Sequence, residues 1–302
     1  MTAPTGMDLV GVVDIGGSHV TAAVVGFDTR GPSIHRRERL AIDARGSRAM
    51  LLDALAMPAL QLLGEGCPAS WTIALPGPFD YDRGIGTFEG VDKFQSLSGV
   101  DLRRELSARW GIDPGRVRFV NDGVAYGIGE WAEGTTGRPR RMLCLTLGTG
   151  VGSAFLDQGR AVSSGPGVPR DGDVHTLLID GRPLEETMSS AALRARYRAA
   201  SGVDLDVEGL CALARTGDAV ASRSIECPLR ALGRAIAPAV ADFDADHVVV
   251  GGAIARSWDV IGGPLISGFA EASVLSHGMQ LSPAVLQDSA PLLGAAVWRL
   301  RA

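Results

Sequence analysis

The sequence predicts an α/β fold built by duplication, and two observations support this expectation. The chain has 302 residues, more than one domain usually contains, so two units with separate cores are expected. A short apolar strand, a glycine turn and a second strand also occur twice, from Leu9 to Phe27 and from Met142 to Leu156. We expect an N-terminal domain over residues 1–120, joined by a closing helix within 290–302, and a larger C-terminal domain over 121–289.

The other elements follow from apolar runs bounded by glycine, proline or capping residues. Further strands are expected over residues 33–41, 71–75, 117–120 and 247–250. Helices are expected over residues 47–63, 101–110, most of 186–241, a stretch ending near 272, and 291–300. The glycine-rich segment from Gly77 to Gly99 is expected to be a long loop, and such loops often carry function.

Composition excludes several kinds of partner. The net charge is −5 and the arginines are scattered, so no nucleic-acid partner is expected. The four cysteines lie far apart without a CxxC spacing, which indicates a reducing compartment. The chain shows neither a secretory leader nor an apolar run long enough to span a bilayer, so we expect a cytoplasmic protein without a membrane partner.

The first candidate site is the turn Asp14-Ile15-Gly16-Gly17-Ser18. An aspartate that ends a buried strand lies at the sheet edge where ligands collect, and the glycines allow backbone N–H groups to approach an anion. A carboxylate beside phosphates requires a cation between them, so Asp14 suggests Mg²⁺, held through water. A tight hairpin with an acidic turn residue is an equally good interpretation of this turn alone.

Three more motifs follow. Gly148-Thr149-Gly150 repeats the glycine turn in the second half, and two such turns could hold one polyphosphate. Asn121-Asp122 follows a strand, where a carboxylate could accept a proton from a hydroxyl, although an aspartate there is more commonly a helix N-cap. Gly251-Gly252 ends a buried strand and leaves room for a flat ring such as a nucleoside.

The ordered set of motifs resembles the ROK family, which holds repressors, open-reading-frame proteins and sugar kinases of the actin-like ATPase superfamily. The resemblance extends over nearly the whole chain, from Leu9 to Ala296, and includes Pro76-Gly77-Pro78 between the first two sites. It implies a two-lobed, duplicated ribonuclease-H-like fold with the active site in the interdomain cleft, ATP and Mg²⁺ as cofactors, and a homodimer.

By the same resemblance, Asp122 is the catalytic base and Asn121 binds the substrate. Asp14 is the Mg²⁺-associated aspartate, and the adenosine motif is Gly251-Gly252. The phosphate turns consist of Gly16, Gly17 and Ser18 in the first half and Gly148, Thr149 and Gly150 in the second.

The chain departs from the family pattern around the substrate. Many members carry a cysteine-rich zinc loop after a histidine, but the nine residues between His175 and Glu185 contain no cysteine, so we expect no zinc site. By resemblance, His175 and Glu185 face the sugar, while a structural histidine and a first-turn helix carboxylate are the alternatives. Glu89, Asp92 and Lys93 replace the usual asparagine-bearing loop, and are either specificity residues or a solvated charged loop. Lys93 is the only lysine of the chain.

These features predict an ATP-dependent kinase for a hydroxyl of a sugar or sugar-like polyol, with a hexose analogue or cyclitol preferred. An ordinary glucokinase is the alternative substrate assignment. A non-catalytic sugar-sensing regulator is disfavoured because only a few residues precede Val10, too few for a DNA-binding domain. An actin-like assembly ATPase would need insertions that we do not identify. Asp122 together with both glycine turns favours catalysis.

Overall fold

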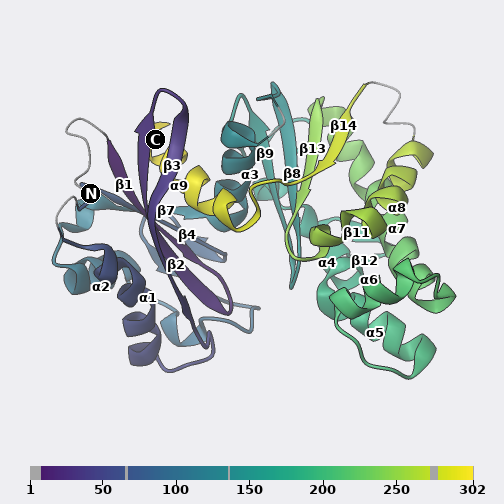
Figure 1. Cartoon of the computed structure of the whole chain (residues 1–302), viewed down its shortest axis with the longest axis horizontal. Coiled ribbons are helices and arrows are strands. Elements are labelled where there is room, and N and C mark those ends of the chain that lie inside the picture. The colour runs from purple at the N-terminus through teal and green to yellow at the C-terminus, as the bar shows by residue number, and fades with distance from the viewer. Residues whose placement is uncertain (1–7, 65–66, 135–136, 273–277, 302) are drawn as a thin grey trace. The chain divides into compact units, whose positions relative to one another are not determined.

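The computed structural model describes residues 8–64, 67–134, 137–272 and 278–301. The chain divides into two compact units: the first runs to Glu133 and resumes at Asp288, and the second is Gly134–Gln287. Each unit contains a five-stranded sheet in which an antiparallel hairpin continues into parallel strands (Figure 1). The predicted α/β class and its duplication are confirmed.

The sheet of unit 1 has the strand order β3-β2-β1-β4-β7. Its strands are β1 (Leu9–Ile15), β2 (His19–Asp28), β3 (Gly31–Ala41), β4 (Trp71–Leu75) and β7 (Val117–Asn121). The first three pair antiparallel, and β4 and β7 run parallel to β1. Polar groups at the ends of β1 and β7 therefore lie at the same edge of the sheet, where α/β proteins bind ligands.

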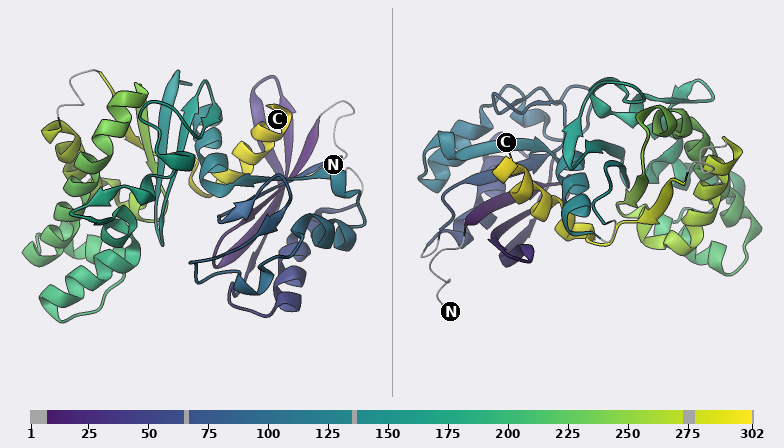
Figure 2. Two further views of the ribbon diagram at one scale, coloured as in Figure 1. Left: turned by 180° about the vertical axis from the view of Figure 1, so that it is seen from behind. Right: turned by 90° about the horizontal axis from the view of Figure 1, so that it is seen from above.

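Helices cover unit 1 from two sides. The main apolar core forms where α1 (Arg48–Leu62) and α2 (Leu102–Trp110) pack on alternate side chains of the sheet, such as Val13, Ile15 and Ile73. The helices α3 (Asp122–Glu133) and α9 (Ala290–Arg301) pack on one another and both contact β4. Figure 2 shows α9 beside α3 in both views.

The contact between α3 and α9 depends on glycine. A Cβ atom added at Gly294 would overlap the carbonyl oxygen of Ala125, and one added at Gly129 would overlap that of Ala290. The two helix backbones therefore touch, which side chains larger than hydrogen would prevent. The division after α3, rather than the expected one after residue 120, follows from this packing.

Unit 2 repeats the arrangement, with the strand order β10-β9-β8-β13-β14. The strands are β8 (Arg141–Leu147), β9 (Val151–Asp157), β10 (Arg160–Val162), β13 (His247–Gly251) and β14 (Gln280–Pro283). Its helices are α4 (Leu184–Met188), α5 (Ser190–Ser201), α6 (Val207–Arg215), α7 (Ala219–Phe243) and α8 (Trp258–Glu271). Strand β14 was not predicted from the sequence.

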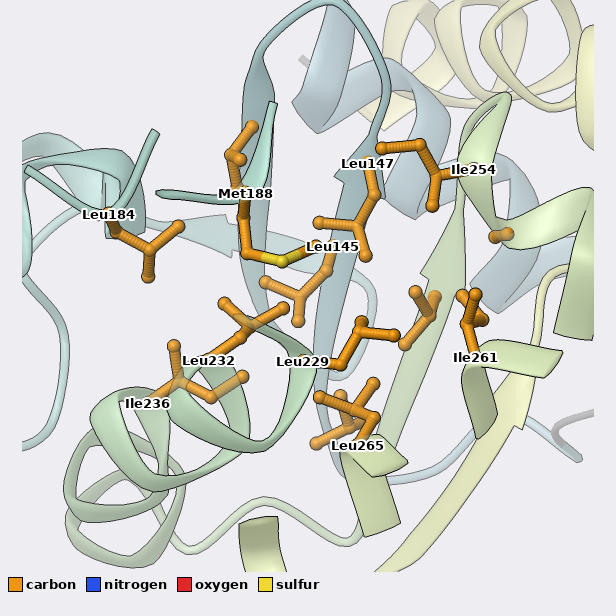
Figure 3. Close-up of a cluster of buried hydrophobic side chains, with 14 of the residues drawn as sticks. Leu145, Leu147, Leu184, Met188, Leu229, Leu232, Ile236, Ile254, Ile261 and Leu265 are labelled. Carbon is orange, nitrogen blue, oxygen red and sulfur yellow. The ribbon is translucent and has the colours of Figure 1, made fainter. Parts of the chain in front are cut away.

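The region expected to be mostly helical over 186–241 consists of the four helices α4 to α7. Ser189, Asp206 and Asp218 each accept a backbone N–H at the start of α5, α6 and α7, and α5 ends at Gly202 with a positive φ of 75°. Figure 3 shows how the pieces share one core: Leu184 and Met188 of α4 point into a cluster with Leu145, Leu147 and side chains of α7 and α8.

The expected loop from Gly77 to Gly99 contains a small hairpin, β5 (Phe79–Asp80) and β6 (Ile85–Gly86), and a 3-10 turn at Gln95–Leu97. Its aromatic residues explain why it is ordered. Phe88 and Phe94 are both 2% exposed and their rings lie 5.6 Å apart within the core of unit 1. The charged residues between them are thus held at both ends by buried rings.

Candidate active site

The first glycine turn connects β1 to β2. The N–H of Gly16 donates to the carbonyl of His19 over 2.9 Å, which closes the turn, and Gly17 and Ser18 lie at its tip. A Cβ atom on Gly17 would lie 2.7 Å from Cε and 2.9 Å from Nζ of Lys93. Glycine at this position therefore allows the lysine side chain to lie directly on the turn.

Asp14 lies next to the end of β1, half-buried. Burial, followed by the negative charges of Asp122 and Asp288, raises the pKa of its carboxyl from 3.8 to about 7, against the opposing effect of Arg37 and Arg39. Asp288 pairs with Arg39 at 3.3 Å. Two carboxylates thus act on Asp14 at this edge of the sheet, so an ionised Asp14 is costly unless a cation compensates it.

The pair Asn121-Asp122 lies where β7 passes into α3. The N–H of Val124 donates to Oδ1 of Asn121 over 3.0 Å, so Asn121 supplies the bond by which a side chain caps the start of a helix. Asp122 accepts the N–H of its neighbour Gly123 at 2.9 Å. The residue expected to bind substrate therefore caps α3, while the expected base stands at its first position.

Tyr81 is a residue that the sequence did not single out. The amide nitrogen of Asn121 donates to the Tyr81 hydroxyl over 3.0 Å, and this hydroxyl donates to the carbonyl of Leu75 over 3.2 Å. Tyr81 thereby connects the ends of β4 and β7 and fixes the orientation of Asn121. Its only sequence signal is its nearness to the Pro76-Gly77-Pro78 turn.

The second glycine turn, in unit 2, is held by Ser190. The carbonyl of Gly148 accepts both the backbone N–H and the hydroxyl of Ser190, each at 2.8 Å, and the N–H of Gly148 donates to the carbonyl of Gly150 over 3.0 Å. Thr149 is exposed at the tip. A Cβ atom on Gly150 would overlap Oε1 of Glu185, so this carboxylate lies against the turn.

The strand β13 brings its two glycines to the same turn. Gly251 is buried and pairs with Thr146 of β8. Gly252 has a φ of 85°, and a Cβ atom there would overlap the backbone of Leu147. The structure therefore groups Gly148, Thr149, Gly150, Glu185, Gly251 and Gly252 within unit 2.

His175 lies in a short 3-10 turn with its side chain 40% exposed and Nδ1 3.9 Å from a carboxylate oxygen of Asp173. Burial raises the pKa of the Asp173 carboxyl, although His175 opposes this. The hydroxyl of Ser153 accepts the N–H of Val174 at 3.0 Å and donates to the carbonyl of Gly172 over 2.6 Å. Ser153, which the sequence did not indicate, thus fixes the segment that carries His175.

A small hairpin connects His175 to Glu185. Its strands are β11 (Leu178–Ile179) and β12 (Arg182–Pro183), and Asp180 and Gly181 at its tip have φ values of 52° and 78°, a pattern typical of a type I′ turn. The N–H of Leu184 donates to the carbonyl of Leu177 over 2.7 Å and closes it. Over the residues that the structure describes, no group of three or more His, Cys, Asp or Glu side chains is arranged to hold a metal ion.

The structure separates the three charged residues of the altered loop. Glu89 is exposed. Asp92 pairs with Arg45 at 2.8 Å on the surface. Lys93 alone reaches a predicted site, since it is half-buried against Gly17.

The chain is similar to ROK family proteins and to named sugar kinases. The model of the ROK family matches residues 10–302. A glucokinase from Thermotoga maritima is 27% identical over 96% of this chain and 96% of its own length, and an N-acetyl-D-glucosamine kinase from Shigella boydii is 26% identical over 80% and 83%.

The fold is shared with a glucokinase from Streptomyces griseus solved in complex with glucose and AMPPNP. That structure has a TM-score of 0.76 and 22% identity, and the match covers 97% of this chain and all of the other. The expected actin-like ATPase fold is confirmed. Among the described helices, none has the length and apolar character to cross a membrane.

Proposed function

The chain belongs to the ROK family, and from that premise we propose that it is an ATP-dependent kinase for a hydroxyl group of a sugar or sugar-like polyol. The observation that carries the proposal is that Asn121, and not Asp122, makes the capping bond at the start of α3. An aspartate after a strand usually caps the helix that follows, but here Asn121 accepts the N–H of Val124 and caps α3 instead. Asp122 is therefore not needed as the cap. A carboxylate at this sheet edge then suits a general base.

Each predicted residue has a role in this reaction. The Asp122 carboxylate accepts the proton of the attacking hydroxyl, while Asn121, fixed by Tyr81, donates to a neighbouring substrate oxygen. The N–H groups at the tips of the two turns, those of Gly17 and Ser18 in unit 1 and of Thr149 and Gly150 in unit 2, bind phosphate oxygens, while those of Gly16 and Gly148 close the turns. Gly251 and Gly252 leave room for the adenosine. The protein acts by positioning and by stabilising charge.

Magnesium fits this arrangement. A carboxyl whose pKa is raised by burial and by two further carboxylates is a hard oxygen donor with an excess of negative charge around it. Mg²⁺ in kinases is held by one or two carboxylates together with waters and the nucleotide phosphates, so a group of three protein ligands is not required. Asp14 would hold the ion through water. The ion would neutralise phosphate charge.

The substrate-facing residues favour a hexose analogue, such as a cyclitol, over glucose. Glu185 and His175 remain the proposed hydroxyl ligands, but the segment between them is a short hairpin without cysteine, and the stretch from Glu89 to Phe94 replaces the asparagine-bearing loop. A site whose buried polar groups match particular hydroxyls discriminates strongly against others. An ordinary glucokinase is the second candidate, because a named glucokinase is among the relatives. We further propose a homodimer.

The test compares the wild type with Asp122→Asn in an ATP-consumption screen over hexoses, N-acetylhexosamines and cyclitols. Loss of a positioned base should lower kcat by about 10²–10⁴-fold with nucleotide binding retained. A variant that keeps most of its kcat would remove Asp122 from the mechanism. If the wild type binds sugars without consuming ATP, the protein is a sugar-sensing regulator instead.

A further inference from the structure

We propose that Lys93 is a catalytic residue that contacts the phosphoryl group during transfer, rather than a determinant of sugar specificity. This inference rests on the proposed kinase function and goes beyond it, since it assigns a new cation to the phosphate turn. Its basis is a position that the sequence did not predict. The only lysine of the chain lies on the first glycine turn, with Cδ, Cε and Nζ all 2.7–2.9 Å from the Cβ that Gly17 lacks.

The residue that follows Lys93 fixes its backbone. Phe94 is buried, its ring centroid lies 5.6 Å from that of Phe88, and its N–H donates to the carbonyl of Ala44 over 2.8 Å. On the other side, the ion pair of Asp92 with Arg45 is exposed to solvent, and such pairs contribute little. The backbone of Lys93 is therefore held by the buried Phe94, and its stem lies along Gly17. A side chain so held loses less conformational entropy when it meets a ligand.

The local charge explains why a cation is needed there. Asp14 lies next to the end of β1 and Asp122 begins α3 at this edge of unit 1, and the charges of Asp122 and Asp288 both act on Asp14, against those of Arg37 and Arg39. A phosphoryl group that reaches the turn brings further negative charge. Backbone N–H groups supply partial positive charge, but an ammonium supplies a full one, and its compact charge is suited to phosphate oxygens.

The transfer step is balanced as follows. The substrate oxygen forms a bond to the γ-phosphorus as the bond to the β,γ-bridging oxygen breaks, the hydroxyl proton passes to Asp122, and ADP leaves. Lys93 gives up no proton and forms no covalent bond. Its ammonium stabilises charge on the non-bridging oxygens, an effect that is larger in the transition state than in the bound substrate.

If Lys93 binds phosphate, its replacement should have other effects than if it binds the sugar. The ammonium on the turn should affect kcat and the affinity for a nucleotide with a γ-phosphate, and it should not alter the ranking of sugars. A specificity residue should change that ranking. A purely structural lysine, whose stem only covers Gly17, should be replaceable by methionine, which keeps an unbranched stem without the charge.

The experiment therefore compares the wild type with Lys93→Met, Lys93→Arg and the control Arg45→Met, which removes a cation from the paired surface residue nearby. For each protein, kcat and kcat/KM are measured with two sugars from the screen, and calorimetry gives the dissociation constants of AMPPNP and ADP. Lys93→Met should lower kcat by about 10²–10³-fold, a loss typical of a missing electrostatic donor. It should weaken AMPPNP binding more than ADP binding and leave the sugar ranking unchanged.

Lys93→Arg should recover part of the loss, and Arg45→Met should behave like the wild type. The inference is overturned if Lys93→Met keeps its kcat, if its sugar ranking changes, or if Arg45→Met loses as much activity. Matching circular dichroism spectra exclude misfolding. A wild type that transfers phosphate to no sugar would remove the proposed function, and the AMPPNP and ADP affinities of Lys93→Met would still test the contact.

Discussion

Replacing Asp14 with asparagine should stabilise the nucleotide-free and metal-free protein, increasingly so as the pH rises. The folded protein holds a proton on Asp14 up to about pH 7, whereas the unfolded chain releases it near pH 3.8. Between these values the unfolded state binds fewer protons, so a rise in pH favours unfolding. The wild type thus loses stability from about pH 4 to about pH 7, and the neutral asparagine of the variant removes this loss.

The magnitude follows from the shift in pKa. A shift from 3.8 to about 7 is roughly three pH units, and at about 1.4 kcal/mol per unit the upper limit is about 4 kcal/mol. Because the side chain is only half-buried, solvent screens part of this effect, and we expect about 2 kcal/mol. About two of these three pH units lie between pH 5 and pH 7, so the upper limit for the relative gain of the variant from pH 5 to pH 8 is about 3 kcal/mol, and screening reduces it to about 1 kcal/mol or less.

The assay is urea denaturation of wild type and Asp14→Asn at pH 5, 6.5 and 8 with EDTA present. Pulse hydrogen exchange of peptides from β1 and β4 assigns the transition to unit 1. Asp28→Asn is the control of opposite sign. Arg30 lowers the pKa of Asp28, so removing the Asp28 carboxylate should lower the stability of the protein above pH 4. Equal pH dependence of wild type and Asp14→Asn, or a variant that weakens as the pH rises, would refute the reasoning. The stabilised variant should also lose turnover, because Asp14 is proposed to hold Mg²⁺.

Two further predictions concern packing and metals. Gly294→Ala should destabilise unit 1 by about 2 kcal/mol or more in the same denaturation assay, because the added methyl overlaps the carbonyl of Ala125. Gly263→Ala, in an exposed helical position with no atom within 4 Å apart from its chain neighbours and its own helix, should change the stability by less than about 1 kcal/mol, because the better helix propensity of alanine is opposed by the ring of Pro264, and similar effects of both variants would contradict the packing argument. Activity should disappear with EDTA and return with Mg²⁺ alone. Metal analysis of protein purified without chelator should find zinc far below one equivalent, and stoichiometric zinc would require ligands that we have not identified.

The sequence by itself determined the α/β class, the duplication and the family. Short apolar runs rich in β-branched residues, each followed by a glycine turn, have few conformations other than strand, turn and strand. Their order along the chain is a property of the sequence, so motifs such as Asp14 to Gly17 and Gly148 to Gly150 could be found without coordinates. The chemistry suggested for them was limited to what residue types allow.

The ends of helices were harder to predict from the local sequence than the helices themselves. The stretch over 186–241 is strongly helical in composition, and its division into four helices depends on caps such as Ser189 and on the left-handed backbone at Gly202. Strand β14 forms because its backbone pairs with β13, and a four-residue strand carries almost no periodic signal of its own.

Only the tertiary structure decided how the predicted side chains are used. Asn121 caps α3 and binds Tyr81, Ser190 holds the Gly148 carbonyl, and Lys93 lies on Gly17. The raised pKa of Asp14 likewise depends on Asp288, from the far end of the chain. Propensity and periodicity describe each residue with its neighbours in sequence, whereas hydrogen bonds, burial and charge interactions depend on distances that exist only after distant segments have packed together.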